Sequence, residues 1–307
     1  MKKTNIGGQA LIEGLLMIGP KSAVTAIRRP DDKIIVEKKI LPPRGSWSKV
    51  PIIRGIIGFA RQMVIGMKAL MYSAEFVDIE EAGSPTKFDK FLERILGDKL
   101  KDAAIYFSVV VAIVLAVGLF ILLPNFLASF IKSDEVSGAG VALRNLLEGI
   151  IRITLFLSYI AVASRLKDIK RIWQYHGAEH KAIHCYEHGD ELTVENVRKY
   201  STKHPRCGTS FLFLVMIVSI IVFSVVGWHG RWMNILLRIL LIPLVAGISY
   251  ELLKLAGRSE MKIMKIIKAP GLALQLLTTN EPDDKQVEVA IEALKGVLAD
   301  SEGEDNW

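Results

Sequence analysis

Four long apolar runs restrict the fold of this chain more than any other feature. They cover residues 103–131, 141–164, 210–228 and 232–256. An α-helix of roughly 20 apolar residues is long enough to cross the hydrocarbon core of a bilayer. The hydrophobic share of 51% and the mean hydropathy of +0.34 also place the chain among membrane proteins. We therefore predict a mainly α, polytopic membrane helical bundle of about four spans.

Charged residues interrupt two of these runs. Arg144, Glu148 and Arg152 recur every fourth residue along one face of the second run, and Arg238 lies near the start of the fourth. Such a stripe cannot face lipid, so it must meet a partner helix, a cavity or the interface. We interpret these charges as pairs that fix helix packing, in preference to a conduction path.

The N-terminal region is predicted to contain a small β-hairpin. Residues 23–28 and 33–38 alternate on either side of a polar turn at 30–32, which is the pattern of two paired strands. Residues 5–14 place glycines on both sides of Glu13, so we expect a loop whose backbone approaches another element closely. Glu13 is interpreted as a solvated loop acid or, alternatively, as an additional site residue.

Amphipathic segments flank the apolar runs. Residues 52–74 are apolar but carry basic side chains, and a charge near the bilayer centre costs about 2.5 to 3.5 kcal/mol, so we predict an interfacial helix. Residues 259–268 place lysines among Met and Ile at helical spacing and are expected to lie along anionic lipid. The pair Pro270-Gly271 is expected to break that helix, and residues 284–298 are expected to form a further amphipathic helix.

These segments divide the chain into five parts. The N-terminal region, residues 1–102, holds the hairpin and interfacial helices, including one from about residue 87 after a loop at 83–85. The other four parts are the first two spans (103–164), a cytoplasmic loop rich in His and Cys motifs (165–209), the last two spans (210–256), and a helical tail with an acidic end (257–307).

Basic residues predict the orientation in the membrane. The segment between the second and third runs carries nine of them: Arg165, Lys167, Lys170, Arg171, Lys181, Arg198, Lys199, Lys203 and Arg206. By the positive-inside rule, this segment and both termini lie in the cytoplasm. Although the net charge is +7, the basic residues lack interleaved aromatic residues. We therefore expect anionic lipid headgroups as partners, and no nucleic acid.

Four of the six histidines lie in one segment, at a spacing of four residues. If this segment is helical, His176, Glu179 and His180 share one face within a single turn. The order His-x-x-Glu-His is the inverted zinc-protease pattern, in which the histidines bind the ion and the Glu acts as general base. The alternative is a surface helix that is rich in histidine. Gly189 is expected to end this helix, and Thr193 to cap a short helix after it.

A second motif precedes the third span. His204 and Cys207 lie three residues apart on a turn at a helix start, where a thiolate would gain from the helix dipole. We interpret both as metal ligands, with a reactive thiol as an alternative role for Cys207 and an ordinary buried cysteine as the simpler one. Two cysteines in so long a chain give no disulfide framework and indicate a reduced compartment.

Glu251 is a candidate third ligand from another helix. Its place downstream of the His pair resembles that of the carboxylate ligand in inverted zinc proteases, and the alternative is an interfacial Glu paired with Lys254. A site of His176, His180 and Glu251 would leave one coordination position open for catalysis, whereas a closed set of His and Cys ligands would be structural. Both arrangements stay open from the sequence.

Several motifs together resemble one family. They are GGQA with the following IEG (residues 7–14), YHGAEHK (175–181), HPRCGTS (204–210), and the tail from PGL to LTT with EP (270–282). These look like the YqhQ family, bacterial membrane proteins with plastid relatives that are classed as predicted metal-dependent enzymes of unassigned function. The resemblance implies that the motif positions here are His176, Glu179, His180, His204 and Cys207, and it implies no substrate.

The combined hypothesis is a multi-pass protein of the bacterial inner membrane with a metal site at its cytoplasmic face. We expect a metal-dependent, hydrolase-like enzyme that uses a divalent ion, zinc first, with iron or manganese as alternatives. Its substrate would be a membrane protein, a lipid headgroup or another surface-bound molecule. The alternative is a non-enzymatic membrane assembly or scaffold factor with a structural metal site, and a transporter is a third hypothesis.

Overall fold

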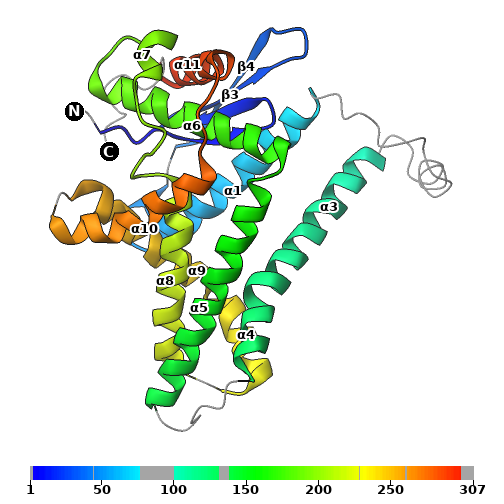
Figure 1. The fold of residues 1–307 in the computed structure, drawn as a ribbon, viewed down its shortest axis with the longest axis vertical. Helices are drawn as coiled ribbons and strands as arrows, with labels where there is room; N and C mark the ends of the chain where they lie inside the picture. The colour runs from blue at the N-terminus through cyan, green and yellow to red at the C-terminus, as the bar shows by residue number, and fades with distance from the viewer. Residues whose placement is uncertain are drawn as a thin grey trace. The chain divides into compact units, whose positions relative to one another are not determined.

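The computed structural model describes residues 3–43, 45–76, 100–130, 138–227, 229–259 and 261–298 (Figure 1). The loop expected at residues 83–85, the helix expected from residue 87 and the acidic end lie outside them. The chain forms two compact units. One contains residues 1–77, 158–222 and 241–307, and the other contains residues 78–157 and 223–240. The described part is mostly helical with one small antiparallel sheet.

The sheet belongs to the first unit and is an antiparallel meander in the order β1-β2-β3-β4. Its strands are β1 (Gly7–Leu11), β2 (Gly14–Ile18), β3 (Ser22–Arg28) and β4 (Ile34–Ile40). The predicted hairpin is confirmed as β3 and β4. The expected loop before it is wrong, because this segment forms a second hairpin that turns at Glu13, where φ is 51°. Glycine has low strand propensity, so the pattern concealed β1.

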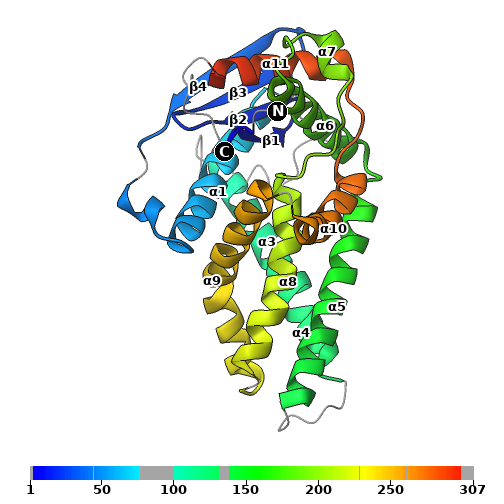
Figure 2. The ribbon, with the colours of Figure 1, turned by 90° about the vertical axis from the view of Figure 1, so that its left-hand side faces the viewer.

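Both faces of the sheet are covered by helices. The face formed by Leu15, Met17, Val24 and Ala26 packs in one core with helices α6 (Lys167–His188) and α11 (Asp284–Leu298). The opposite face, formed by Leu11, Leu16 and Ala23, packs on Ala69 of α1 (Ile53–Ala74) (Figure 2). Because side chains alternate between faces, a strand buried on both sides reads as a continuous apolar run, as β2 does.

The helix that carries the histidines ends as predicted. Gly189 follows α6 with a φ of 83°, the left-handed conformation that glycine adopts without steric cost. The hydroxyl of Thr193 accepts a hydrogen bond of 3.2 Å from the backbone N–H of Asn196 and caps α7 (Val194–Arg198). Both predicted helix boundaries are therefore confirmed.

Helices α8 (Gly208–Val226) and α10 (Lys262–Thr278) lie against each other in the first unit (Figure 2). A Cβ atom on Gly271 would lie 2.5 Å from the hydroxyl of Ser210, so the glycine allows close packing. The predicted break at Pro270 is wrong, since α10 continues through it. Packing on α8 holds the helix although proline supplies no N–H.

The second unit contains α3 (Leu100–Val117), a π-helical turn η3 (Gly118–Leu122), α4 (Leu123–Ala128) and most of α5 (Gly138–Ala163). The π turn ends at Leu122, two residues before Pro124, and both π turns and prolines are common sites of helix kinks.

The charged stripe of α5 is buried in the second unit. Glu148 accepts a hydrogen bond of 2.7 Å from Arg152 and also forms an ion pair with Arg238 of α9 (Arg231–Arg258). Asn125 donates a further bond of 3.3 Å to the same carboxylate. Glu148 is thus paired with Arg152 and Arg238 within the protein, which agrees with the interpretation of these charges as packing pairs.

Four described helices are long and apolar enough to cross a membrane. They are Val110–Ala128, Gly140–Ala163, Gly208–Val226 and Trp232–Arg258. Each corresponds to one of the apolar runs of the sequence, and many of their large apolar side chains are exposed.

Candidate metal centre

Three potential metal ligands from two separate segments meet in the first unit. His176 and His180 lie one turn apart on α6, and Cys207 is the residue before α8. One ligand atom from each lies within 4.8 Å of the other two, and the Nε2 atom of His176 is 3.0 Å from the Sγ atom of Cys207. All three side chains are buried. The predicted meeting of the His helix with Cys207 is therefore present.

Backbone carbonyls fix the orientation of both imidazole rings. The Nδ1 atom of His176 lies 2.7 Å from the carbonyl oxygen of Thr278, and that of His180 lies 2.5 Å from the carbonyl oxygen of Thr202. Because a carbonyl oxygen only accepts, both Nδ1 atoms carry a proton. With Nδ1 engaged, Nε2 is the ring nitrogen that a metal ion would bind once its proton is displaced. This is the usual outer-shell arrangement of metal-binding histidines.

The surroundings of Cys207 favour its thiolate form. Burial raises the pKa of its thiol, but the charges of His176 and His180 outweigh burial and bring the pKa well below its ordinary value. The backbone N–H of Thr209, in the first turn of α8, donates to Sγ over 3.4 Å. Burial lowers the pKa of His176, but the thiolate raises it to about 9. The Nε2 atom of His176 and the Sγ atom of Cys207 share a proton here, and both are atoms that a divalent ion would bind.

Glu179 lies beside this cluster, at the edge of the sheet. The backbone N–H of Gly8 in β1 donates to its carboxylate, and a Cβ atom on Gly8 would lie 2.9 Å from the carboxyl carbon. Only glycine allows this approach. Burial raises the pKa of the Glu179 carboxyl above its ordinary value, more than the nearby histidines lower it.

Two buried atoms of the centre have no hydrogen-bond partner among the residues that the structure describes. They are Oε2 of Glu179 and Nε2 of His180. A buried polar atom left unpaired costs about 1 to 3 kcal/mol, so native proteins rarely retain one without a ligand or water. Both atoms belong to the candidate centre, and this fits a site built for an ion.

The donor set also fits zinc. Zinc takes imidazole nitrogen and thiolate at about 2.0 to 2.3 Å, which requires ligand atoms roughly 3.5 Å apart in a tetrahedron. The observed separations, from 3.0 Å to at most 4.8 Å, bracket that value. Three protein ligands with one position left open are typical of catalytic zinc, whereas structural sites have four.

His204 is not brought to this centre. It forms a second group with His184 and Glu187, and its ring centroid lies 5.6 Å from that of His180. The guanidinium of Arg206 pairs with both oxygens of Glu187, so a cation already occupies this group. Burial alone would raise the pKa of Glu187, but His204, the backbone N–H of Thr4 and Arg206 lower it to about 2.

Glu251 does not reach the centre either. Both of its carboxylate oxygens accept hydrogen bonds from Arg54 of α1, and one also accepts a bond of 3.2 Å from the backbone N–H of Ile52. The structure therefore places Glu251 in an ion pair between α1 and α9 instead of in the metal shell. Its hydrogen-bonded partner is Arg54, whereas the sequence left two roles open, a metal ligand and a partner of Lys254.

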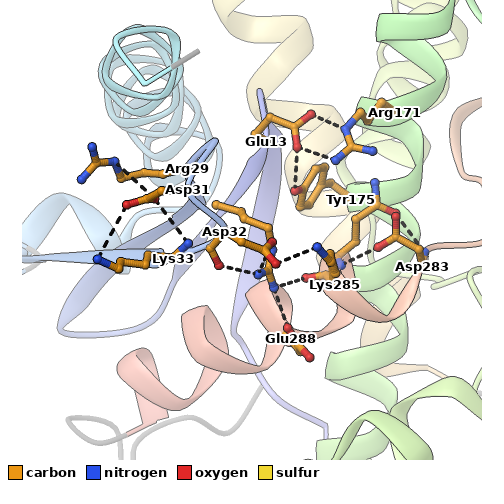
Figure 3. Close-up of polar contacts among 12 residues, drawn as sticks. Glu13, Arg29, Asp31, Asp32, Lys33, Arg171, Tyr175, Asp283, Lys285 and Glu288 are labelled. Carbon is orange, nitrogen blue, oxygen red and sulfur yellow. Dashed lines mark hydrogen bonds and ion pairs between the residues drawn. The ribbon is translucent and has the colours of Figure 1, made fainter. Parts of the chain in front are cut away.

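Glu13 anchors the sheet to α6. Figure 3 shows its carboxylate facing Arg171, with which it forms an ion pair, and the hydroxyl of Tyr175, 3.2 Å away. The same view shows Lys285 of α11 paired with Asp32 at the β3–β4 turn, over 2.7 Å. Glu13 is thus neither a solvated loop acid nor part of the metal cluster.

Several residues that shape the centre were missed by sequence reasoning. Thr202 and Thr278 contribute only carbonyl oxygens, which any residue type could supply. Gln275 of α10 holds the backbone of His204 through two hydrogen bonds of 2.8 Å. Among these contacts, only that of Gly8 could be expected from the sequence, because a glycine-rich segment indicates that the backbone approaches another element closely.

Comparisons with known proteins identify the relatives of this chain. The model of a family described as "Protein of unknown function (DUF1385)" matches residues 50–300. The chain is also 38% identical over 301 residues to "Uncharacterized protein YqhQ" of Bacillus subtilis, which covers 95% of this chain and 92% of the relative. The chain belongs to the YqhQ family. The resemblance seen in the YHGAEHK and HPRCGTS motifs is thereby confirmed. No solved structure matches the chain.

Proposed function

We propose that this YqhQ-family chain is an integral membrane enzyme that depends on a divalent metal ion, zinc first, and acts as a hydrolase. One observation carries the proposal. Two oriented imidazoles and a thiolate meet in a buried cluster, and beside it lies a buried carboxylate with one unpartnered oxygen. Three protein ligands support a catalytic role for the ion over the alternative of a scaffold factor with a structural metal.

The chain's own residues have separate roles in this proposal. His176, His180 and Cys207 would hold the ion. When bound, the ion would supply Lewis acidity and lower the pKa of water at the open position. Glu179 would accept the proton, since its carboxylate lies beside the cluster and burial raises its pKa above the ordinary value, which makes it a stronger base. Gly8 would fix the Glu179 carboxylate through its N–H.

We also propose that the centre lies at the cytoplasmic face of the cell membrane. The four apolar helices support a multi-pass protein, and the basic segment that contains α6 supports a cytoplasmic side for it and for both termini. Helix α10 exposes Ile263 and Ile266 together with Lys262 and Lys265. Such a surface supports contact with anionic headgroups.

The first experiment measures metal per chain by elemental analysis of the full-length protein in uncharged detergent. Wild type, Glu179→Gln and His188→Ala are expected to carry about one ion, because ligation needs neither of the last two side chains. His188 is the matched control, an exposed histidine on the same helix. His180→Ala is expected to lose at least nine-tenths of the metal. Equal metal in wild type and His180→Ala would contradict the proposal.

The second experiment tests catalysis. Membranes from a strain that lacks the chain are incubated with wild type, Glu179→Gln or His188→Ala, and the released products are compared by mass spectrometry. Wild type and His188→Ala are expected to release the same products, and Glu179→Gln none, since removal of a general base typically costs 10²-fold to 10⁴-fold in rate. Products that persist with Glu179→Gln would remove Glu179 from the reaction.

A further inference from the structure

A cavity of about 190 Å³ lies next to the candidate centre, within the first unit. The residues that line it come from the start of the chain, from α6, from the turn before α8, and from α9 and α10: Lys3, His184, Glu187, His204, Arg206 and Lys268, with Pro205 and Gly257. His204 lines this cavity, and its ring centroid lies 5.6 Å from that of His180 in the metal cluster. A molecule in the cavity would therefore be one side chain away from the centre.

The lining of this cavity is predominantly basic. Lys3, Arg206 and Lys268 are cationic, and Glu187 is the single acid among the lining residues. His204 adds an imidazole ring to the lining, whose nitrogens can form hydrogen bonds. An anion that enters meets more positive than negative charge, and the low local dielectric strengthens the attraction.

Arg206 is held in place before any ligand arrives. Its guanidinium pairs with both oxygens of Glu187 and donates a hydrogen bond of 3.0 Å to the carbonyl oxygen of Thr4. Lys268 donates to the carbonyl oxygen of Ser259 over 3.2 Å. A planar guanidinium in a fixed orientation suits the tetrahedral oxygens of a phosphate, and lysine adds a point charge.

The cavity lies where an apolar surface meets a basic one. Gly257 belongs to the last turns of the candidate span Trp232–Arg258, and Lys268 lies on α10, which begins shortly after it. The intervening and adjoining side chains of Met261, Ile263 and Ile266 are exposed. Apolar side chains bordered by lysines are typical of a segment at headgroup level.

We propose that this cavity binds the phosphate group of the substrate, so that the enzyme acts on phosphate-bearing molecules at the membrane surface. That the bound molecule is a substrate rests on the proposed function, whereas phosphate binding by the cavity does not. The chemistry is shared by a phospholipid headgroup and by a free phosphate, and the test separates these two sources.

The test is isothermal titration calorimetry of the full-length protein in uncharged detergent. The probes are inorganic phosphate, dihexanoyl phosphatidic acid and, as the control without phosphate, dihexanoylglycerol. The variants are Lys268→Gln, Lys3→Gln and the control Lys265→Gln, an exposed lysine on α10 outside the cavity. Metal content is measured on each sample. We expect Lys268→Gln and Lys3→Gln each to weaken binding of the anionic probes about tenfold, and Lys265→Gln to leave it unchanged.

Each outcome decides between the two proposals. Binding of both anionic probes, or of phosphatidic acid alone, supports the cavity with a lipid headgroup as the source, and binding of inorganic phosphate alone supports it with a free phosphate. If no anionic probe binds, if dihexanoylglycerol binds as well as phosphatidic acid, or if the three lysine variants behave alike, the cavity proposal is overturned. If the wild-type protein contains no metal but binds phosphate in a lysine-dependent way, only the proposed metal enzyme is overturned. If it contains metal but binds no phosphate, only the cavity proposal is overturned.

Discussion

The Nε2 atom of His176 and the Sγ atom of Cys207 lie 3.0 Å apart although 31 positions separate them in the chain. The contact joins α6 to the start of α8, and it brings a nitrogen and a sulfur to the separation at which one ion could bind both. Because the remaining ring nitrogen of His176 is fixed by the Thr278 carbonyl, this geometry does not depend on the ion.

The two cysteines are expected to differ in reactivity. Burial raises the pKa of Cys185 to about 11, so its thiol stays protonated at pH 7, whereas His176 and His180 bring the pKa of Cys207 well below its ordinary value. After chelation of metal, iodoacetamide at pH 7 should label Cys207 at least tenfold faster than Cys185, as read by peptide mass spectrometry. Added zinc should protect Cys207. Equal labelling of both thiols, with or without zinc, would contradict the assignment.

Gly8→Ala is expected to disturb the centre from a neighbouring strand. Its new Cβ atom would lie 2.6 Å from the carbonyl oxygen of Leu16 and 2.9 Å from the Glu179 carboxyl carbon. We expect a loss of about 1 to 3 kcal/mol in unfolding free energy, because these groups must shift. Gly7→Ala is the control, since nothing lies within 4 Å of its Cβ position. Urea unfolding in detergent compares the two, and equal losses would show that Glu179 is not held as described.

Glu187 is expected to make the fold sensitive to acid. Its pKa of about 2 in the folded protein lies below the ordinary 4.5, so its stabilisation is complete above pH 4.5 and is lost as pH falls toward 2. The shift corresponds to about 3 kcal/mol. The lowered pKa of His204 acts in the same direction between pH 6.5 and 4. Urea unfolding from pH 7 to 3 should show this decline, and Glu187→Gln should flatten its lower part. If the unfolding free energy of the variant falls with pH as steeply as that of wild type, the decline comes from other groups.

Glu251→Gln is expected to leave metal content unchanged. The carboxylate pairs with Arg54 and does not reach the cluster of His176, His180 and Cys207. The substitution should lower the unfolding free energy by about 1 to 3 kcal/mol, because the partly buried guanidinium loses its charged partner. Elemental analysis beside Cys207→Ser checks the first expectation, since only the latter should lose metal. Loss of metal in Glu251→Gln would contradict this expectation and indicate that Glu251 is a metal ligand.

Features that depend on neighbours in the chain could be predicted from the sequence. The apolar runs gave the four long helices, the β3–β4 hairpin followed from its alternation and turn, and the end of α6 followed from Gly189. The one-turn spacing of His176 and His180 is likewise local, because helical geometry places residues four apart on one face.

What only the tertiary structure decided was which distant groups meet. Cys207 lies beside the histidine pair, but His204, three residues before it, lies beside Glu187 instead. Glu251 forms an ion pair with Arg54. The β1 strand and its contact between Gly8 and Glu179 also went unpredicted. The physical reason is that propensity and hydropathy act within a few residues. Contacts between distant residues depend instead on how whole elements pack, and a one-residue change of register would redirect every side chain.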